Sequence, residues 1–308
     1  MTRPSVIVPL VTPLTPEREL DLDSLGSLID YVVDRGVDGV LVLGSSGECV
    51  ALSAEQRLEV ARFTTAHGRG RTKVMLGVAA WGAADAIGEA RALAALDPDW
   101  LLVCAPGGMR LSPDELAQHF ERIAAVGAPV IAYDVPARVI VGLEPSMIAS
   151  LAEHGVIAGL KDSTGDIVKA RRYADATRHI PGFVRYTGCE EVVDGTLLVG
   201  YDGAVPGMAM VFPEWHVALA AAAEAGRWDE AARLQGEIVQ LMDLYFHTLP
   251  GGSFLAQFFA SVKEALRQKG VIAHATTSAE FVVAGDSLTQ HVTRILELGE
   301  KLRPGLPA

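Results

Sequence analysis

Cysteine is scarce in this sequence: the 308 residues contain only Cys49, Cys104 and Cys189. An odd number of widely separated cysteines does not predict a disulfide framework and is typical of reduced thiols in a cytoplasmic protein. All three fall near expected strand ends, the second, fourth and seventh, which raises the idea of a metal site. Zinc sites usually show ligand pairs close together in sequence, and neither H-E-x-x-H nor C-x-x-C occurs, so we expect no metal.

Basic residues are also few, with 26 Lys and Arg against 38 Asp and Glu and a formal net charge of -12. Nucleic acids and anionic membranes attract clustered positive charge, so we expect neither as a partner and expect a small-molecule substrate instead. No apolar run is long enough for a membrane span. The first residues, "MTRPSVIVPLVTPL", are broken by Pro9 and Pro13 and make a poor signal peptide, which favours a cytoplasmic protein.

Short apolar runs alternate with longer helical patterns from the first residues to about residue 223, which indicates repeated β-α units. The runs predict eight strands at residues 6–11, 39–43, 73–78, 100–103, 129–133, 156–161, 183–187 and 203–206. Eight such units predict an α/β fold of the (β/α)8 TIM barrel type. A doubly wound sheet is the alternative, but no G-x-G-x-x-G follows the first strand.

Helical patterns continue beyond the eighth strand, in residues 213–226, 227–249, 254–270 and 287–302. We therefore expect a catalytic barrel in residues 1–223 and a helical C-terminal extension in residues 224–308. Gly251 and Gly252 predict a loop or hinge inside that extension.

Lys161 ends the sixth predicted strand, and the chain has only six lysines. In a TIM barrel the chemistry gathers at the carboxyl ends of the strands. An amine among apolar neighbours loses hydration of its charged form and becomes available as a nucleophile that forms imines with carbonyl compounds. The alternative is a lysine that extends to solvent.

Other strand ends carry polar residues with open interpretations. Tyr133 ends the fifth strand, where its hydroxyl could deliver protons to the neighbouring lysine or simply reach solvent. The "GSSGE" segment from Gly44 to Glu48 offers hydroxyls and backbone N–H groups for a carboxylate, although it reads equally as a plain turn. Glu190 and Glu191 could bind sugar hydroxyls or begin a helix.

Taken in order, "GSSGE", "YDVP", "LKDSTGD", "GCEE" and "GYDGAVPG" resemble the dihydrodipicolinate synthase and N-acetylneuraminate lyase superfamily over nearly the whole chain. The resemblance implies a class I aldolase or lyase that forms a Schiff base with pyruvate or a 2-keto acid and needs no cofactor. It also implies a homo-oligomer, a dimer or tetramer.

The resemblance assigns roles to individual residues. Lys161 would form the imine, Tyr133 would shuttle the proton, and Ser45 and Ser46 would bind the substrate carboxylate, with Ser46 relaying protons. The remaining substrate-binding candidates are Thr12, Arg138, Gly188, Glu191 and Val205.

The sequence departs from the synthase pattern after the fourth strand. "CAPGGMRLSP" places Gly107 and Gly108 where the synthases carry paired tyrosines of the proton relay, so we expect a wider pocket. Arg138 is retained, as the arginine that in the synthases binds the second substrate's carboxylate, and Arg110 could add another cation.

Three functions follow from these observations. The first is an aldolase or hydro-lyase for a 2-keto-3-deoxy sugar acid or a 4-hydroxy-2-oxo acid, favoured by the two glycines and the Glu190–Glu191 pair. The second is a dihydrodipicolinate synthase that condenses pyruvate with aspartate semialdehyde, favoured by Arg138. The third is a catalytically silent barrel that binds a keto acid, which the retention of Lys161 and Tyr133 opposes.

Overall fold

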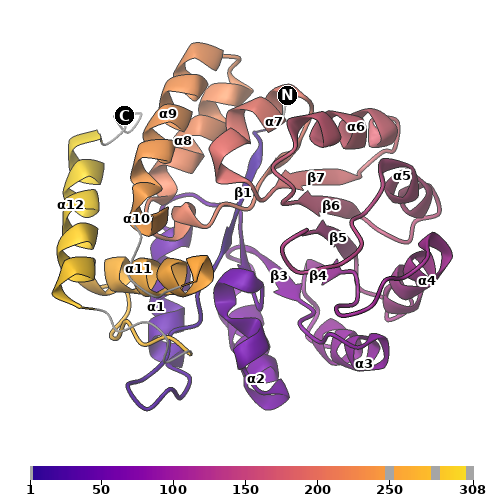
Figure 1. Cartoon of the computed structure of the whole chain (residues 1–308), viewed down its shortest axis with the longest axis horizontal. Coiled ribbons are helices and arrows are strands. Elements are labelled where there is room, and N and C mark those ends of the chain that lie inside the picture. Colours follow the sequence, from indigo (N-terminus) through magenta and orange to yellow (C-terminus); the bar gives the residue numbers. More distant parts are fainter. Residues whose placement is uncertain (1–2, 247–252, 279–284, 303–308) are drawn as a thin grey trace.

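The computed structural model describes residues 3–246, 253–278 and 285–302 and shows a closed barrel of eight parallel strands in the order β1 to β8 (Figure 1). The strands are β1 Ser5–Pro9, β2 Gly39–Val42, β3 Lys73–Gly77, β4 Trp100–Cys104, β5 Val130–Asp134, β6 Gly159–Asp162, β7 Val184–Thr187 and β8 Gly203–Ala204. The prediction of a (β/α)8 TIM barrel is confirmed.

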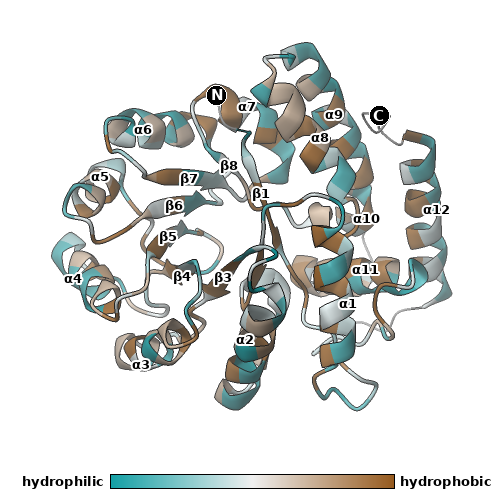
Figure 2. Cartoon of the chain, turned by 180° about the vertical axis from the view of Figure 1, so that it is seen from behind, coloured by the Kyte–Doolittle hydropathy of each residue, from teal (hydrophilic) through white to brown (hydrophobic). Residues whose placement is uncertain are grey.

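Helices form the outer ring around this barrel (Figure 1). They are α1 Leu22–Val33, α2 Ala54–Gly68, α3 Ala83–Ala94, α4 Pro113–Ala124, α5 Pro145–Glu153, α6 Ile167–Thr177, α7 Val193–Leu198 and α8 Pro213–Glu224. Local sequence fixes several starts: Ser53 and Ser112 form capping boxes with Gln56 and Glu115. Apolar residues on many of the helices lie toward the strands (Figure 2).

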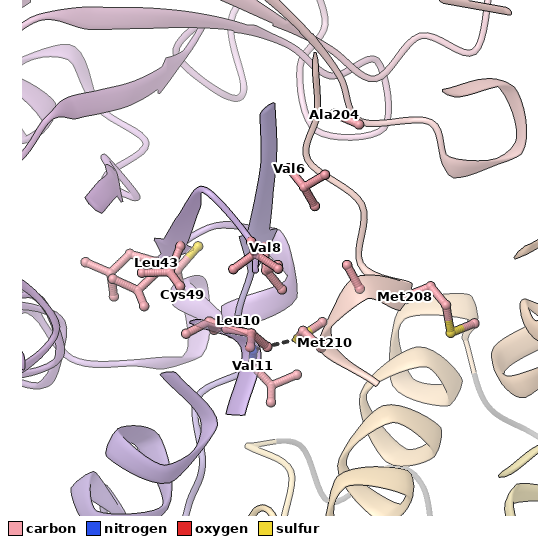
Figure 3. Close-up of a cluster of buried hydrophobic side chains, with 14 of the residues drawn as sticks. Val6, Val8, Leu10, Val11, Leu43, Cys49, Ala204, Met208 and Met210 are labelled. Atoms are coloured by element: carbon pink, nitrogen blue, oxygen red, sulfur yellow. Dashed lines mark hydrogen bonds between the residues drawn. The ribbon is translucent and has the colours of Figure 1, made fainter. Parts of the chain in front are cut away.

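The core has two layers because side chains alternate along each strand. One cluster joins residues of six of the strands and of the segments just beyond β5 and β8, and fills the barrel interior: Ile7, Leu41, Met75, Leu102, Ile131, Tyr133, Val135, Tyr186 and Val205. The alternate residues form a larger cluster with the helices. Figure 3 shows this outer layer near β1, where the Val11 N–H donates to Met210 Sδ at 3.1 Å.

The eighth strand is shorter than the predicted 203–206. A Cβ on Gly203 would lie 2.1 Å from the Ser5 carbonyl oxygen, so only glycine allows this approach of β8 to β1. Val205 follows the strand, and its N–H donates to the Thr187 carbonyl at 2.7 Å. Pro206 has no N–H with which to continue the ladder.

The C-terminal extension contains α9 Trp228–Leu241, α10 Asp243–Phe246, α11 Phe254–Gln268 and α12 Asp286–Leu302. The single helix predicted for residues 227–249 is therefore two helices over its described part, because Met242 closes α9 as its C-cap. Gly251 and Gly252, where a loop is predicted, lie outside the described residues.

The extension and the barrel share one hydrophobic cluster, which includes Leu234, Val262 and Val292 beside strand residues such as Val40. The division of the chain into residues 1–223 and 224–308 stays a prediction. Among the helices in the described ranges, none combines the length and hydropathy that a membrane crossing needs.

Candidate active site

Strands β5, β6 and β7 place Tyr133, Lys161 and Tyr186 in register across the barrel. The next residues on β5 and β6, Asp134 and Asp162, are also paired and face the opposite way. This alternation separates a layer of candidate catalytic side chains inside the barrel from a structural layer of carboxylates outside it.

The two outward carboxylates are fully engaged with the surrounding helices and loops. Asp134 accepts from Lys169 Nζ and from the Tyr173 hydroxyl, both at 2.7 Å. Asp162 accepts from the Tyr201 hydroxyl at 2.8 Å and from the Thr164 hydroxyl at 2.7 Å. These bonds fix the ends of β5 and β6 and thereby the side chains on the inner face.

Lys161 is 6% exposed, and its Nζ lies 4.4 Å from the centroid of the Tyr133 ring. Within the described part of the chain, it has no carboxylate at ion-pair distance, in contrast to Lys169, which pairs with Asp134. The Lys161 amine therefore faces an aromatic ring rather than a counter-ion, so its lone pair is accessible to an electrophile once the amine is neutral.

Ser163 joins this pair, and sequence reasoning missed it. Its hydroxyl donates to the Tyr133 hydroxyl at 3.4 Å. A Cβ on Gly188 would lie 2.1 Å from Ser163 Oγ and 3.0 Å from Lys161 Cε, so the space at Gly188 belongs to these two side chains. The signal was present, because Ser163 lies two residues after Lys161 and shares its face of the extended backbone.

The "GSSGE" segment forms a short 3-10 turn, Ser45–Gly47, directly beyond β2. The Thr12 hydroxyl donates to the Gly47 carbonyl at 2.7 Å and so supports the turn from β1. Arg138 Nη1 donates to Ser45 Oγ at 3.2 Å. Thr12 and Arg138 thus hold the serine turn in place. Their direct contact with a substrate stays a prediction.

Glu48 closes the turn and ties it to the C-terminal extension. It has a left-handed backbone, with φ 53°, and its buried carboxylate pairs with Lys263 Nζ of α11 at 2.5 Å. The other carboxylate oxygen accepts from the backbone N–H of Ser278 at 2.7 Å. The extension therefore positions the serine turn through a buried ion pair, which also was not predicted.

The space beside Gly107 is not open as expected. A Cβ there would lie 1.7 Å from Cε3 of Trp81, so the indole occupies the volume that a side chain at residue 107 would take. The Arg138 guanidinium lies 5.9 Å from the Trp81 ring. Trp81 follows β3, and the rule that functional residues follow barrel strands could have identified it.

A cavity of about 240 Å³ opens over the ends of β6 and β7. Of the predicted site residues, Ser45, Ser46, Gly188 and Glu191 line it, together with Ser163. The outer wall comes from the extension: Met242, Tyr245, Phe246, Phe254, Leu255 and Phe258. Thr12 and Val205 are buried and do not line this cavity.

The two glutamates after β7 differ in their surroundings. Glu191 is exposed, whereas Glu190 is buried and accepts from the Met208 N–H at 2.6 Å and the Tyr245 hydroxyl at 2.9 Å. Burial raises the pKa of Glu190 to about 7 despite these bonds. His216 Nε2 lies 3.9 Å from Glu190, and burial lowers the pKa of His216 to about 4.

The cysteines are free thiols, and burial raises the pKa of each, that of Cys189 to about 12. Such thiols are poor nucleophiles at neutral pH. In the described ranges, no three His, Cys, Asp or Glu side chains are grouped as a metal site requires. The expectation of no metal or cofactor stays a prediction.

Comparisons with known proteins identify the family of this chain. The model of the dihydrodipicolinate synthetase family matches residues 3–298. The 4-hydroxy-tetrahydrodipicolinate synthase of Azoarcus sp. (strain BH72) is 35% identical over 237 residues, which are 76% of this chain and 80% of that enzyme.

Two solved structures have the same fold over almost their whole length. Dihydrodipicolinate synthase from Bacteroides thetaiotaomicron has a TM-score of 0.89 and 26% identity, covering 96% of this chain and 98% of its own. YagE, a prophage protein of the dihydrodipicolinic acid synthase family from E. coli K12 in complex with pyruvate, has a TM-score of 0.85 and 26% identity, covering 98% and 99%.

The predicted resemblance and enzyme class are thus confirmed by a match that spans the barrel and most of the extension. This chain belongs to the dihydrodipicolinate synthetase family and is a lyase of the Schiff-base-forming, class I pyruvate aldolase type.

Proposed function

We propose that Lys161 forms the imine with pyruvate or a 2-keto acid and that the protein cleaves or forms the C3–C4 bond of a 4-hydroxy-2-oxo acid, a class that includes the 2-keto-3-deoxy sugar acids. The observation that carries the proposal is the buried Lys161 amine, 4.4 Å from the Tyr133 ring centroid and without a counter-ion in the described residues. An amine in this setting is suited to nucleophilic catalysis.

In the cleavage direction, the neutral Lys161 amine adds to the C2 keto group. Tyr133 gives its proton to the departing hydroxyl, which leaves as water, so a protonated imine and the Tyr133 phenolate remain. The 4-hydroxyl proton passes to Tyr133, the C3–C4 bond breaks, the aldehyde departs, and the electron pair enters the enamine. Protonation of the enamine at C3 and hydrolysis of the imine return pyruvate and free Lys161. Ser163, bonded to the Tyr133 hydroxyl, extends the proton path.

The serine turn supplies the carboxylate site in this proposal. Ser45 and Ser46 line the cavity beside Gly188, and Arg138 holds Ser45 from the other side. A fixed carboxylate orients the keto group toward Lys161, and such orientation accounts for much of the rate in bimolecular reactions. Thr12, Glu191 and the Val205 carbonyl remain proposed contributors to binding.

A second candidate is the condensation of pyruvate with aspartate semialdehyde. The curated relatives named 4-hydroxy-tetrahydrodipicolinate synthase favour it, as does the retained Arg138. The absence of tyrosines at Gly107 and Gly108 weighs against it. Since Arg138 donates to Ser45 in this structure, its guanidinium is partly committed to the turn.

The experiment measures release of pyruvate from a panel of 4-hydroxy-2-oxo acids and, separately, consumption of pyruvate with aspartate semialdehyde. We expect turnover of at least one 4-hydroxy-2-oxo acid. Turnover with aspartate semialdehyde and with no 4-hydroxy-2-oxo acid would replace the first function by the second.

The proposal also includes the cellular location, the oligomeric state and the ligands of the enzyme. We place it in the cytoplasm as a homo-oligomer, a dimer or tetramer, with a small-molecule substrate and no resident cofactor. The net charge of -12 supports the small-molecule substrate, and the free thiols support the cytoplasm. Light scattering of the purified chain tests the oligomer.

A further inference from the structure

The cavity over the ends of β6 and β7, whose lining residue Gly188 lies beside Lys161, has two chemically different halves. The inner half presents hydroxyls and backbone at Ser45, Ser46, Ser163 and Gly188. The outer half is built from the apolar side chains of α10 and α11 and from Met242. A 4-hydroxy-2-oxo acid has the same division, with a keto acid at one end and the aldehyde-derived group at the other. If the keto acid binds at the serines, the aldehyde half faces the extension.

The outer half is an ordered aromatic cluster rather than a scatter of apolar residues. The Tyr245 ring lies 5.0 Å from the Phe258 ring and 6.2 Å from the Phe254 ring, and Phe246 lies 5.7 Å from Phe254, between ring centroids. Rings at these separations and tilts offer edges and faces to a further ring.

Part of this cluster is open to solvent. Phe246, Phe254 and Leu255 are each about half exposed, at 50%, 52% and 50%. Exposed large apolar groups beside a catalytic cavity favour an apolar ligand group, which removes both surfaces from water.

Polar groups near this wall are poorly placed for a polyhydroxylated substrate. The buried Glu190 already accepts from the Tyr245 hydroxyl and the Met208 N–H, so the carboxylate and the phenol proton satisfy each other. Glu191 is the one remaining charged side chain among the lining residues. Among the described lining residues, Glu191 is an exposed carboxylate and none is Lys or Arg, which disfavours an anionic aldehyde.

We propose that the aldehyde half of the substrate is uncharged and aromatic or otherwise apolar, and that the wall formed by Phe246, Phe254, Leu255 and Phe258 selects it. This inference rests on the proposed function, with Lys161 as the imine-forming residue. It narrows the 4-hydroxy-2-oxo acids to those with an apolar group on C4 and sets aside the sugar acids.

The test runs the reaction in the condensation direction, where the pyruvate enamine attacks an aldehyde and forms the C3–C4 bond. The aldehydes are benzaldehyde, glyceraldehyde and succinic semialdehyde, which are apolar, hydroxylated and anionic respectively. We expect kcat/KM for benzaldehyde to exceed that for each of the others at least tenfold. A preference for glyceraldehyde or succinic semialdehyde would overturn the inference.

Phe254→Ala tests the wall itself. We expect the ratio of kcat/KM for benzaldehyde over glyceraldehyde to fall about tenfold, chiefly through KM for benzaldehyde. The matched control is Val239→Ala on α9, which is 47% exposed and does not line the cavity; its ratio should equal that of the unaltered protein. Should Phe254→Ala change the oligomeric mass and leave the aldehyde ratio untouched, the surface is a subunit contact and the inference is wrong.

Borohydride trapping with pyruvate alone distinguishes failure of the aromatic-wall inference from failure of the proposed function. A pyruvate adduct on Lys161 together with the wrong aldehyde preference rejects the aromatic wall and leaves the proposed function standing. Absence of the adduct from the folded protein rejects the proposed function and this inference with it.

Discussion

Two lysines of this protein are buried, and their surroundings could hardly differ more. Lys161, at the end of β6, is 6% exposed and faces the Tyr133 ring. Lys263, on α11, is fully buried, pairs with Glu48 at 2.5 Å and donates to the Thr276 carbonyl at 2.8 Å. Burial lowers the pKa of Lys263, while Glu48 opposes that shift. Burial alone therefore does not distinguish the proposed nucleophile; the absence of a counter-ion among the described residues and the position at a barrel strand end do.

On our proposal Lys161 carries the chemistry, whereas Lys263 has a structural role. A buried ion pair is costly to break because the remaining charge has no solvent. An amine that faces a cavity can be removed with little loss of packing if its replacement has the same length. The substitutions below, from the largest expected effect to the smallest, test this division.

Lys161→Met is expected to have the largest effect. It removes the nucleophile and keeps an unbranched apolar chain, so kcat should fall by about 10⁴-fold or more while the folded state keeps its stability. Steady-state kinetics and urea unfolding measure the two quantities. If Lys161→Met protein that contains no unaltered enzyme still turns over substrate at a substantial rate, Lys161 is not the residue that forms the imine.

Lys263→Met should instead destabilise the fold. It leaves the Glu48 carboxylate buried without its cation, at a cost of about 3–5 kcal/mol. Urea unfolding measures the loss, and KM for pyruvate should rise because Glu48 closes the serine turn. The double variant Glu48→Gln with Lys263→Met is the control and should recover a large part of the stability. A loss of activity without any loss of stability would contradict the structural role.

Glu190 is also buried, and within the described residues it has no Lys or Arg partner at ion-pair distance. Its pKa is raised from 4.5 to about 7, so the stability that its protonated form contributes is present below pH 4.5 and is lost as pH rises through 7. A shift of that size is worth about 3 kcal/mol. The difference in unfolding free energy between Glu190→Gln and the unaltered protein should therefore grow by that amount from pH 4.5 to 7.

His216 provides the control of opposite sign for that measurement. Its pKa is lowered from 6.5 to about 4, so the folded protein favours the neutral ring and loses stability as pH falls through this range. The unfolding free energy of His216→Gln should rise relative to that of the unaltered protein as pH falls. If the stability differences of Glu190→Gln and His216→Gln from the unaltered protein change with pH in the same direction, then either the raised pKa of Glu190 or the lowered pKa of His216 is wrong.

Gly107→Ala, in the loop after β4, carries the smallest expected effect. The new methyl group would displace the Trp81 indole, which is 49% exposed and has solvent to move into. We expect a stability change within about 1 kcal/mol and a change in tryptophan emission. The emission change should be absent when Gly107→Ala is made in a Trp81→Phe background. If the change persists there, it comes from another tryptophan and not from displacement of Trp81.

The sequence predicts the barrel, which the structure confirms, and the candidate site at its strand ends, and both predictions have a physical basis. Both depend on short-range patterns, namely apolar runs of strand length and the residue at which each run ends. Lys161 and Tyr133 stand out by this rule alone, and their register across β5 and β6 agrees with it. Ser163 follows from the same period of two, although it was overlooked.

The rest of the site depends on contacts between distant segments, which no local pattern encodes. Glu48 bonds to Ser278, 230 residues away along the chain, and the partner lysine lies on a helix that reads as ordinary amphipathic sequence. The prediction of a wider pocket at Gly107 was wrong for a similar reason, because Trp81, from the loop after the neighbouring strand β3, fills that space. The aromatic wall of α10 and α11 likewise appears only when the extension is folded over the barrel.

The most direct test of the difference between the two lysines is covalent trapping. The protein is incubated with pyruvate and borohydride, digested, and examined by peptide mass spectrometry. We predict one reduced pyruvate adduct per chain, on the peptide that contains Lys161, and an unmodified Lys263. An adduct on Lys263, or no adduct on Lys161 in folded protein, would contradict the account.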